Sequence, residues 1–205
     1  MKNAYTALAL ALGFALAALG AHAQTTTVDG QPSQQSQPQQ PGAQQAAPAA
    51  NQAGQPSELS GDDRRFLKNA VQGSFAEIQG SQLALEKTKS QDVKDFAQMM
   101  VQDHEKMAKE AAKLASDKGV TPPTGPSAMQ VTEITALKAL SGGAFDAMYV
   151  NRIGVAAHES TVQMFEEASR EADDPDVKAL ATEALPKLRE HLKMANALNQ
   201  KQDSK

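Results

Sequence analysis

The chain has 205 residues, a formal net charge of −4, no cysteine, no tryptophan and only 4% aromatic residues. The absence of cysteine excludes a disulfide framework, a thiol nucleophile and a thiolate metal site. A mildly acidic chain without a basic patch is not expected to bind nucleic acid. What remains is a small helical domain, preceded by two segments that do not contribute to its core.

Residues 1–23 have the pattern of an export signal. Lys2 precedes an apolar run, and Ala21-His22-Ala23 forms a small-x-small cleavage site. We expect cleavage after Ala23, with a retained membrane anchor as the alternative, because about 18 apolar residues can just cross a bilayer. After cleavage no integral membrane segment is expected. The expected location is the periplasm, and association with the outer membrane or the cell wall stays open.

Residues 24–57 are rich in glutamine, proline and alanine, and Asp29 is their only charged residue. Such a segment cannot offset its ordering entropy by burying apolar surface, so we predict a disordered linker. It is either a tether that gives the domain reach or a spacer without a specific role. The folded domain is therefore expected to span residues 58–205.

The spacing of apolar residues in this domain predicts an all-α fold with very few β-branched runs. Serine and aspartate caps, and glycine and proline stop signals, divide the pattern into separate helices. The expected long helices span residues 60–88, 90–118, 143–172 and 174–199, and a short helix spans residues 127–140. Four amphipathic helices bury their apolar stripes against one another, so a four-helix bundle is predicted. A kink is expected at Pro186.

Each long helix carries one polar residue of ligand type on its apolar seam. The second, third and fourth helices carry His104, His158 and His191, and the first carries Glu77. Counted from the turns between helices, the four positions fall at similar heights in an antiparallel bundle. We therefore expect them to meet in the core, and we refer to them together as the His/Glu cluster. On the third helix, the predicted seam before the histidine consists of Ala144, Met148, Asn151 and Val155.

The His/Glu cluster is open to two interpretations. Three imidazoles and one carboxylate without sulfur suit zinc, copper, nickel or iron, and bundle cores often hold such sites. The alternative is a hydrogen-bonded polar network that fixes the register of the helices.

Several neighbours of the histidines are candidate outer partners of such a site. Asp103, Glu159 and Glu190 adjoin them in sequence but point about 100° away around each helix, so they are expected as hydrogen-bond partners of the cluster. Met100 and Met107 flank His104 on its seam. A thioether beside imidazole favours copper(I), although methionine at helical spacing is also common core filler.

The segment from about Asp62 to Leu198 resembles a bacterial family of unknown function, ferritin-like secreted proteins often labelled predicted outer-membrane proteins. The resemblance rests on Glu77, Phe96-Ala97, Met100-Val101, Asp103-His104, Phe145-Asp146, Tyr149, His158, Leu185-Pro186 and His191. It implies a ferritin-like up-down bundle, in which the short helix lies in a crossover between the second and third long helices. It does not imply di-iron chemistry, because the Glu-x-x-His motif of such sites is absent before all three histidines.

Three functions stay open at this stage. The first is a metal-binding protein of envelope metal or stress homeostasis, holding one transition metal such as zinc, copper or iron. The second is a non-catalytic bundle that interacts with envelope components and uses the cluster only for structure. An enzyme is least favoured, because the sequence contains no nucleophile elbow, phosphate loop or Ser-His-Asp pattern and identifies no catalytic residue. The sequence does not predict the oligomeric state.

Overall fold

The computed structural model describes residues 59–204, so the predicted export signal and linker lie outside the described residues. Within this part every regular element is helical. The elements are α1 (Gly61–Lys87), α2 (Gln91–Asp117), α3 (Ala128–Lys138), α4 (Gly142–Met148), the π-helix η1 (Tyr149–Ala156), α5 (Ala157–Glu171) and α6 (Pro175–Asp203). Because α4, η1 and α5 follow one another without a break, they form the third long helix. The predicted all-α fold is confirmed.

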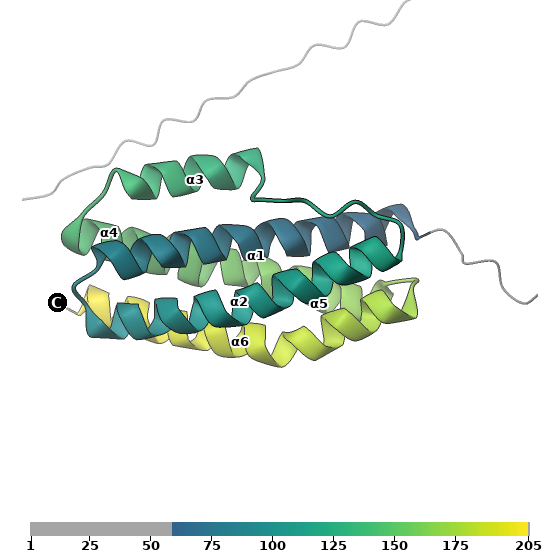
Figure 1. The fold of residues 1–205 in the computed structure, drawn as a ribbon. Helices are drawn as coiled ribbons and strands as arrows, with labels where there is room; N and C mark the ends of the chain where they lie inside the picture. Colours follow the sequence, from purple (N-terminus) through teal and green to yellow (C-terminus); the bar gives the residue numbers. More distant parts are fainter. Residues whose placement is uncertain (1–58, 205) are drawn as a thin grey trace, which may run out of the picture. The chain divides into compact units, whose positions relative to one another are not determined.

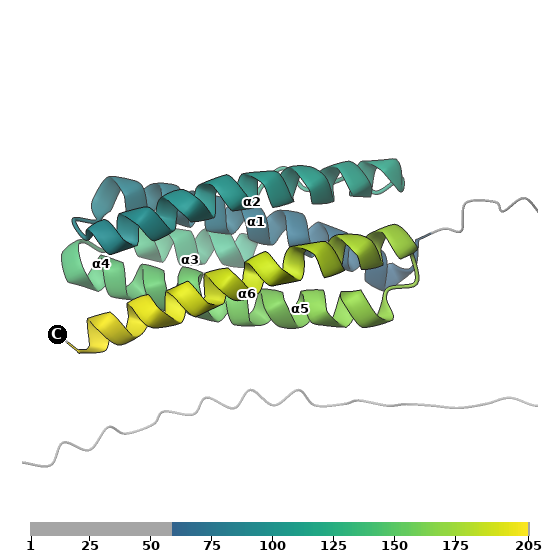
Figure 2. The same cartoon turned by 90° about the horizontal axis from the view of Figure 1, so that it is seen from below.

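The four long helices form two antiparallel hairpins that pack against each other (Figures 1 and 2). The first hairpin is α1 with α2, and the second is the α4–η1–α5 helix with α6. The connection after α2 runs back along the bundle, and its short helix α3 lies on the outer side of α1 (Figure 1). This crossover makes α2 and α5 run in the same direction, as the resemblance implied.

The predicted helix starts are present as capping interactions. The Ser60 hydroxyl accepts a hydrogen bond from the Asp63 backbone N–H at 3.0 Å, and Ser127 and Gln130 form a complete capping box. The Asp174 carboxylate accepts from the backbone N–H groups of Asp176 and Val177, which follow Pro175. These caps satisfy donors that a helix start otherwise leaves unpaired. The structure continues α6 through Pro186 without ending the helix.

The core consists of two hydrophobic clusters with a polar layer between them. One cluster gathers residues near the start of α1 and the end of α2, including Leu67 and Ala111, with Phe165 of α5. The other gathers residues near the end of α1 and the start of α2, including Phe96, with Tyr149 of η1. On every long helix, the member of the His/Glu cluster lies between the residues of these two apolar clusters.

The predicted seam of the third helix is only partly correct before the histidine. Met148 and Val155 are half-buried and pack against the apolar core. Ala144 and Asn151 are exposed. The buried residues of this stretch are instead Phe145, Tyr149, Val150, Ile153 and Gly154. The physical reason is η1, in which the Ala157 N–H donates to the carbonyl of Arg152, five residues back instead of four. A π segment takes more residues per turn, so it rotates the buried face relative to an ideal α-helix.

Two glycines let the helices approach closely beside the polar layer. A Cβ atom on Gly154 would lie 3.1 Å from the Ala195 Cβ of α6, and one on Gly80 would lie 3.1 Å from a side-chain carbon of Ile153. Both distances are shorter than ordinary carbon contacts. The absence of a side chain at these positions therefore brings α1, η1 and α6 together around the cluster.

Candidate metal centre

The structure brings the four predicted seam residues together in the bundle core. Glu77 comes from α1, His104 from α2, His158 from α5 and His191 from α6. Their exposed fractions are 2% for Glu77, 1% for His104 and 0% for His158 and His191. Each long helix therefore contributes one buried polar side chain to a single layer.

The three imidazole rings converge closely enough to share an ion. One ring nitrogen from each histidine lies within 4.8 Å of those of the other two. The Nε2 atoms of His104 and His158 are 3.4 Å apart. Two imidazole nitrogens bound to one tetrahedral zinc ion, each at about 2.0–2.1 Å, would be separated by about 3.3 Å. The spacing therefore suits two ligands of a common ion.

The other nitrogen of each ring is held by a neighbour on the outside. The Nδ1 atom of His158 lies 3.2 Å from the Ile153 carbonyl oxygen, and the Nε2 atom of His191 lies 2.9 Å from the Asp103 carboxylate. The Nδ1 atom of His104 lies 2.7 Å from Glu77 Oε2, an ion-pair distance that lacks the alignment of a hydrogen bond. Glu77 Oε1 is also 3.7 Å from His158 Nδ1.

These outer contacts assign the tautomers of the rings. A carbonyl or carboxylate oxygen only accepts hydrogen bonds, so the ring nitrogen that faces it carries the proton. The inner nitrogens are then His104 Nε2, His158 Nε2 and His191 Nδ1, each with a lone pair. Of these, His191 Nδ1 is buried without any hydrogen-bond partner. Leaving such an atom unpaired costs about 1–3 kcal/mol, which a bound cation would offset.

Burial also keeps two of the histidines neutral. It lowers the pKa of His191 from 6.5 to about 4, although Asp103 opposes that shift. Burial likewise lowers the pKa of His158, against the opposing charge of Glu77. For Glu77, burial alone would raise the pKa, but the nearby histidines outweigh it and hold the pKa below its ordinary value. Neutral imidazole is the form that binds metal, so these rings need not lose a proton at neutral pH.

Only some of the candidate outer partners lie next to the histidines. Asp103 contacts His191 directly, whereas Glu159 and Glu190 are exposed on the helix surface. The Glu190 carboxylate instead pairs with Lys187, 3.1 Å away. Met100 is buried within the apolar cluster that contains Phe96, and Met107 is half-buried against a small cavity that His104 also lines.

Two further contacts lie beside the cluster. The Ile153 carbonyl reaches His158 because the π-helix η1 changes the backbone hydrogen-bonding pattern at this point. The Tyr149 hydroxyl forms a buried hydrogen bond of 2.8 Å with Ser81, one turn after Glu77 on α1. Burial raises the pKa of Tyr149 well above its ordinary value, and the charge of Glu77 adds to that effect. Tyr149 therefore stays protonated beside the cluster.

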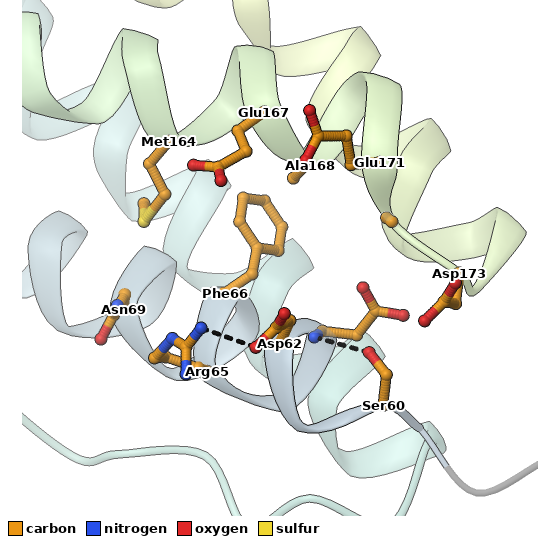
Figure 3. A pocket seen from close by; sticks show the side chains of 12 residues that line it. Ser60, Asp62, Arg65, Phe66, Asn69, Met164, Glu167, Ala168, Glu171 and Asp173 are labelled. Carbon is orange, nitrogen blue, oxygen red and sulfur yellow. Dashed lines mark hydrogen bonds and ion pairs between the residues drawn. The ribbon is translucent and has the colours of Figure 1, made fainter.

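A separate hollow of about 210 Å³ lies between the start of α1 and the end of α5 (Figure 3). Two of its acidic residues, Asp62 and Asp63, already have partners in the fold. Asp62 pairs with Arg65 at 2.6 Å, as Figure 3 shows, and the carboxylate of Asp63 accepts from the Asp174 backbone N–H at 2.9 Å. These carboxylates serve the helix termini, so the His/Glu cluster remains the candidate site.

The model of one protein family, described as Domain of unknown function (DUF4142), matches residues 43–198. The chain belongs to this family. The resemblance to a family of unknown function is confirmed to that extent. No curated protein is significantly similar to this DUF4142 chain.

Solved structures of similar fold come from two other groups of proteins. A DUF305 fragment from Deinococcus radiodurans has a TM-score of 0.60 at 16% identity, covering 69% of this chain and 98% of its own. A DUF305 protein from Streptomyces coelicolor, described as a candidate secreted protein, has a TM-score of 0.58 at 14% identity. The match covers 69% of this chain and 94% of the Streptomyces coelicolor chain. A conserved hypothetical protein from Mycobacterium tuberculosis has a TM-score of 0.54 at 18% identity. The match covers 68% of this chain and 91% of the Mycobacterium tuberculosis chain. At these identities the similarity shows the fold alone.

The helices of residues 59–204 carry polar and charged residues along much of their length. None of these described helices is both long and apolar enough to cross a membrane.

Proposed function

We propose that this DUF4142 domain binds one transition-metal ion through His104, His158 and His191. The observation that carries this proposal is the convergence of three buried imidazole rings, each with an oxygen atom against its outer nitrogen. A ring proton on each outer nitrogen, where the neighbouring oxygen can accept it, would leave three acceptor nitrogens facing one another in the core. A cation is the natural partner of such an arrangement.

A purely structural role explains this arrangement less well. Buried polar networks in proteins usually satisfy their hydrogen-bonding groups, because each unpaired group costs free energy. Here His191 Nδ1 has no partner, and protonation of the outer nitrogens would leave the Nε2 atoms of His104 and His158, 3.4 Å apart, with lone pairs facing each other. On the outer side, His158 and His191 have hydrogen-bond partners and His104 Nδ1 faces the Glu77 carboxylate at 2.7 Å, whereas His191 Nδ1 has no partner on the inner side.

Glu77 and Asp103 have the positions of carboxylate partners in this proposal. A ligating histidine commonly donates its second N–H to a carboxylate or a carbonyl, which fixes the ring and increases its basicity. Asp103 does so for His191, and Glu77 lies against the outer nitrogen of His104. This position favours Glu77 as a partner of the histidines over the fourth-ligand role that its seam position predicts.

The donor set restricts the class of metal. Three imidazoles without a thiolate suit zinc, copper or iron, and a bound ion would supply Lewis-acid or redox chemistry at its remaining coordination position. The absence of the Glu-x-x-His motif argues against a di-iron centre. We place this binding in envelope metal or stress homeostasis, on the basis of the predicted export signal and the description of the Streptomyces coelicolor protein.

Replacing Asp103 by asparagine tests the site without removing a ligand. The Asp103→Asn variant is expected to bind zinc 10–100-fold more weakly, the usual effect of losing an outer partner of a ligating histidine. Glu190→Gln is the matched control, because Glu190 adjoins His191 in sequence but is exposed. The measurement is a competition titration of the metal-free mature protein against a zinc-binding dye.

The two variants and the wild type separate the possible outcomes of this titration. Equal affinities in both variants would contradict the role of Asp103. A wild-type protein that binds no zinc, copper or iron would contradict the metal site altogether, and the cluster would then be structural.

A further inference from the structure

The His/Glu cluster is buried, yet a groove leads to it from the surface. This groove, with a volume of about 430 Å³, lies between α1, α3 and the η1–α5 helix. Its lining includes Gly73 and Glu77 from α1, Glu133 from α3, and Arg152 from η1. The bottom of the groove therefore reaches a member of the cluster.

A small inner cavity adjoins the groove on the side of the histidines. Its volume of about 10 Å³ is close to that of one water-sized sphere. Five residues line both spaces, namely Asn69, Gly73, Glu77, Thr161 and Met164. The inner cavity is also lined by His104. The shared lining places the groove and the cavity next to each other, between the surface and His104.

A glycine, Gly73, lies where the two spaces meet. Gly73 lies one helical turn before Glu77, and a Cβ atom placed on it would meet no atom within 4 Å. A side chain at this position would therefore extend into empty space that the groove and cavity share. This contrasts with Gly80 and Gly154, where a Cβ atom would meet a packed neighbour at 3.1 Å.

The charges of the groove suit a cation. Arg152 and Glu133 form an ion pair of 2.7 Å within its lining and neutralise each other. Glu77 is the remaining charged residue of the lining, and it also lines the inner cavity beside His104. An incoming cation therefore meets a net negative charge at the inner end of the groove.

The opposite side of the cluster is less suited to a cation. There Asp103 is 28% exposed, but its carboxylate is engaged with His191 Nε2 at 2.9 Å. The Lys187 ammonium lies 3.7 Å from the same carboxylate oxygen. A cation arriving on this side would meet a positive charge and would have to displace a hydrogen bond.

We propose that the groove between α1, α3 and α5 is the route by which a transition-metal ion reaches the buried histidines, with Gly73 as its opening and Glu77 as the carboxylate that first receives the ion. This inference rests on the metal binding proposed above. A route affects the barrier to binding and not the end states. Closing it should therefore slow loading and release by the same factor and leave the affinity unchanged.

The test is a stopped-flow measurement of cobalt(II) loading into the metal-free mature protein, followed by release to a chelator. Gly73→Leu is expected to slow both rates at least tenfold, and Gly73→Ala by a smaller factor, with affinity preserved. Both variants should fold, because replacing glycine inside a helix favours the helix by up to about 1 kcal/mol. Gly143→Leu is the matched control, since Gly143 is also a helical glycine on which a Cβ atom would meet nothing within 4 Å, and it lies outside the groove.

The results separate this route from the metal site itself. Loading of Gly73→Leu at the wild-type rate would overturn the route, and faster loading of Lys187→Met would then place it on the Asp103 side. A Gly73→Leu protein with lower affinity but unchanged loading rate would also overturn it, because residue 73 would then shape the site. If the wild type binds no cobalt, zinc or copper, the metal site fails and the route fails with it.

Discussion

Replacement of His158 by alanine is expected to weaken transition-metal binding more than about 100-fold, since the loss of a mere outer partner already costs 10–100-fold. His158 is fully buried, and its Nε2 atom lies 3.4 Å from that of His104. Its removal leaves two imidazoles, too few for a closed site on an ion that prefers four ligands. The measurement is a dye-competition titration with zinc and with copper on the metal-free mature protein.

The control for this variant is the adjacent carboxylate. Glu159 is exposed, so Glu159→Ala should bind metal as the wild type does. Circular dichroism of both variants establishes that the bundle is folded before affinities are compared. His104→Ala and His191→Ala should each reproduce the loss, because each supplies one of the three inner nitrogens. Wild-type affinity in a folded His158→Ala protein would rule out the three-histidine site.

The metal-free protein is expected to lose stability as the pH falls from about 6.5 to about 4. Burial lowers the pKa of folded His191 to about 4, whereas an unfolded histidine titrates near 6.5. Between these values the unfolded chain binds a proton that the folded protein does not, so acid favours unfolding. The contribution of His191 is fully present above pH 6.5 and is lost on acidification, amounting to roughly 3 kcal/mol at 1.36 kcal/mol for each pH unit.

His158 and Glu77 also make the folded protein less stable as the pH falls. The pKa of His158 is also lowered by burial, so it adds to the loss over the same range. Glu77 has a lowered pKa, so its contribution is present above its ordinary pKa of 4.5 and is lost at lower pH, as the carboxylate takes up a proton.

Denaturant unfolding of the metal-free protein at pH 7.5 and pH 4.5 measures this effect. The free energy of unfolding should fall by a few kcal/mol in the wild type and by less in His191→Leu. A stability that stays constant between these pH values would contradict the burial of neutral histidines in the core.

The fold could be predicted from the sequence because its signals are local. Serine and aspartate caps mark where helices begin, and apolar residues at steps of three and four mark their buried faces. The same periodicity placed Glu77 and the three histidines on facing seams, and the structure brings them together.

The π-helix could not be predicted in this way. Nothing in the sequence from Tyr149 to Ala156 separates it from an ordinary α-helix, and its hydrogen bonding rotates the buried face. The prediction of a uniform α-helix therefore placed Asn151 on the buried face. In the structure Asn151 is exposed, and Tyr149, Val150 and Ile153 are buried. The carbonyl that holds His158 depends on the same local change.

The outer partners show a second limit of sequence reasoning. Asp103, Glu159 and Glu190 are each adjacent to a seam histidine, so their sequence positions are equivalent. Only the packing of α2 against α6 brings Asp103 to His191, while the other two face outward. The groove that reaches Glu77 likewise depends on how α3 lies over α1, which no local pattern predicts.

The most direct test of the central claim is the metal content of the mature protein, purified without an affinity tag from its native compartment. Elemental analysis is expected to find one zinc, copper or iron ion per chain, in keeping with a single three-histidine site. The ion should be absent from His158→Ala purified in the same way. A wild-type protein that contains no transition metal, and takes up none on titration, would contradict the account and leave the His/Glu cluster a structural element of the bundle.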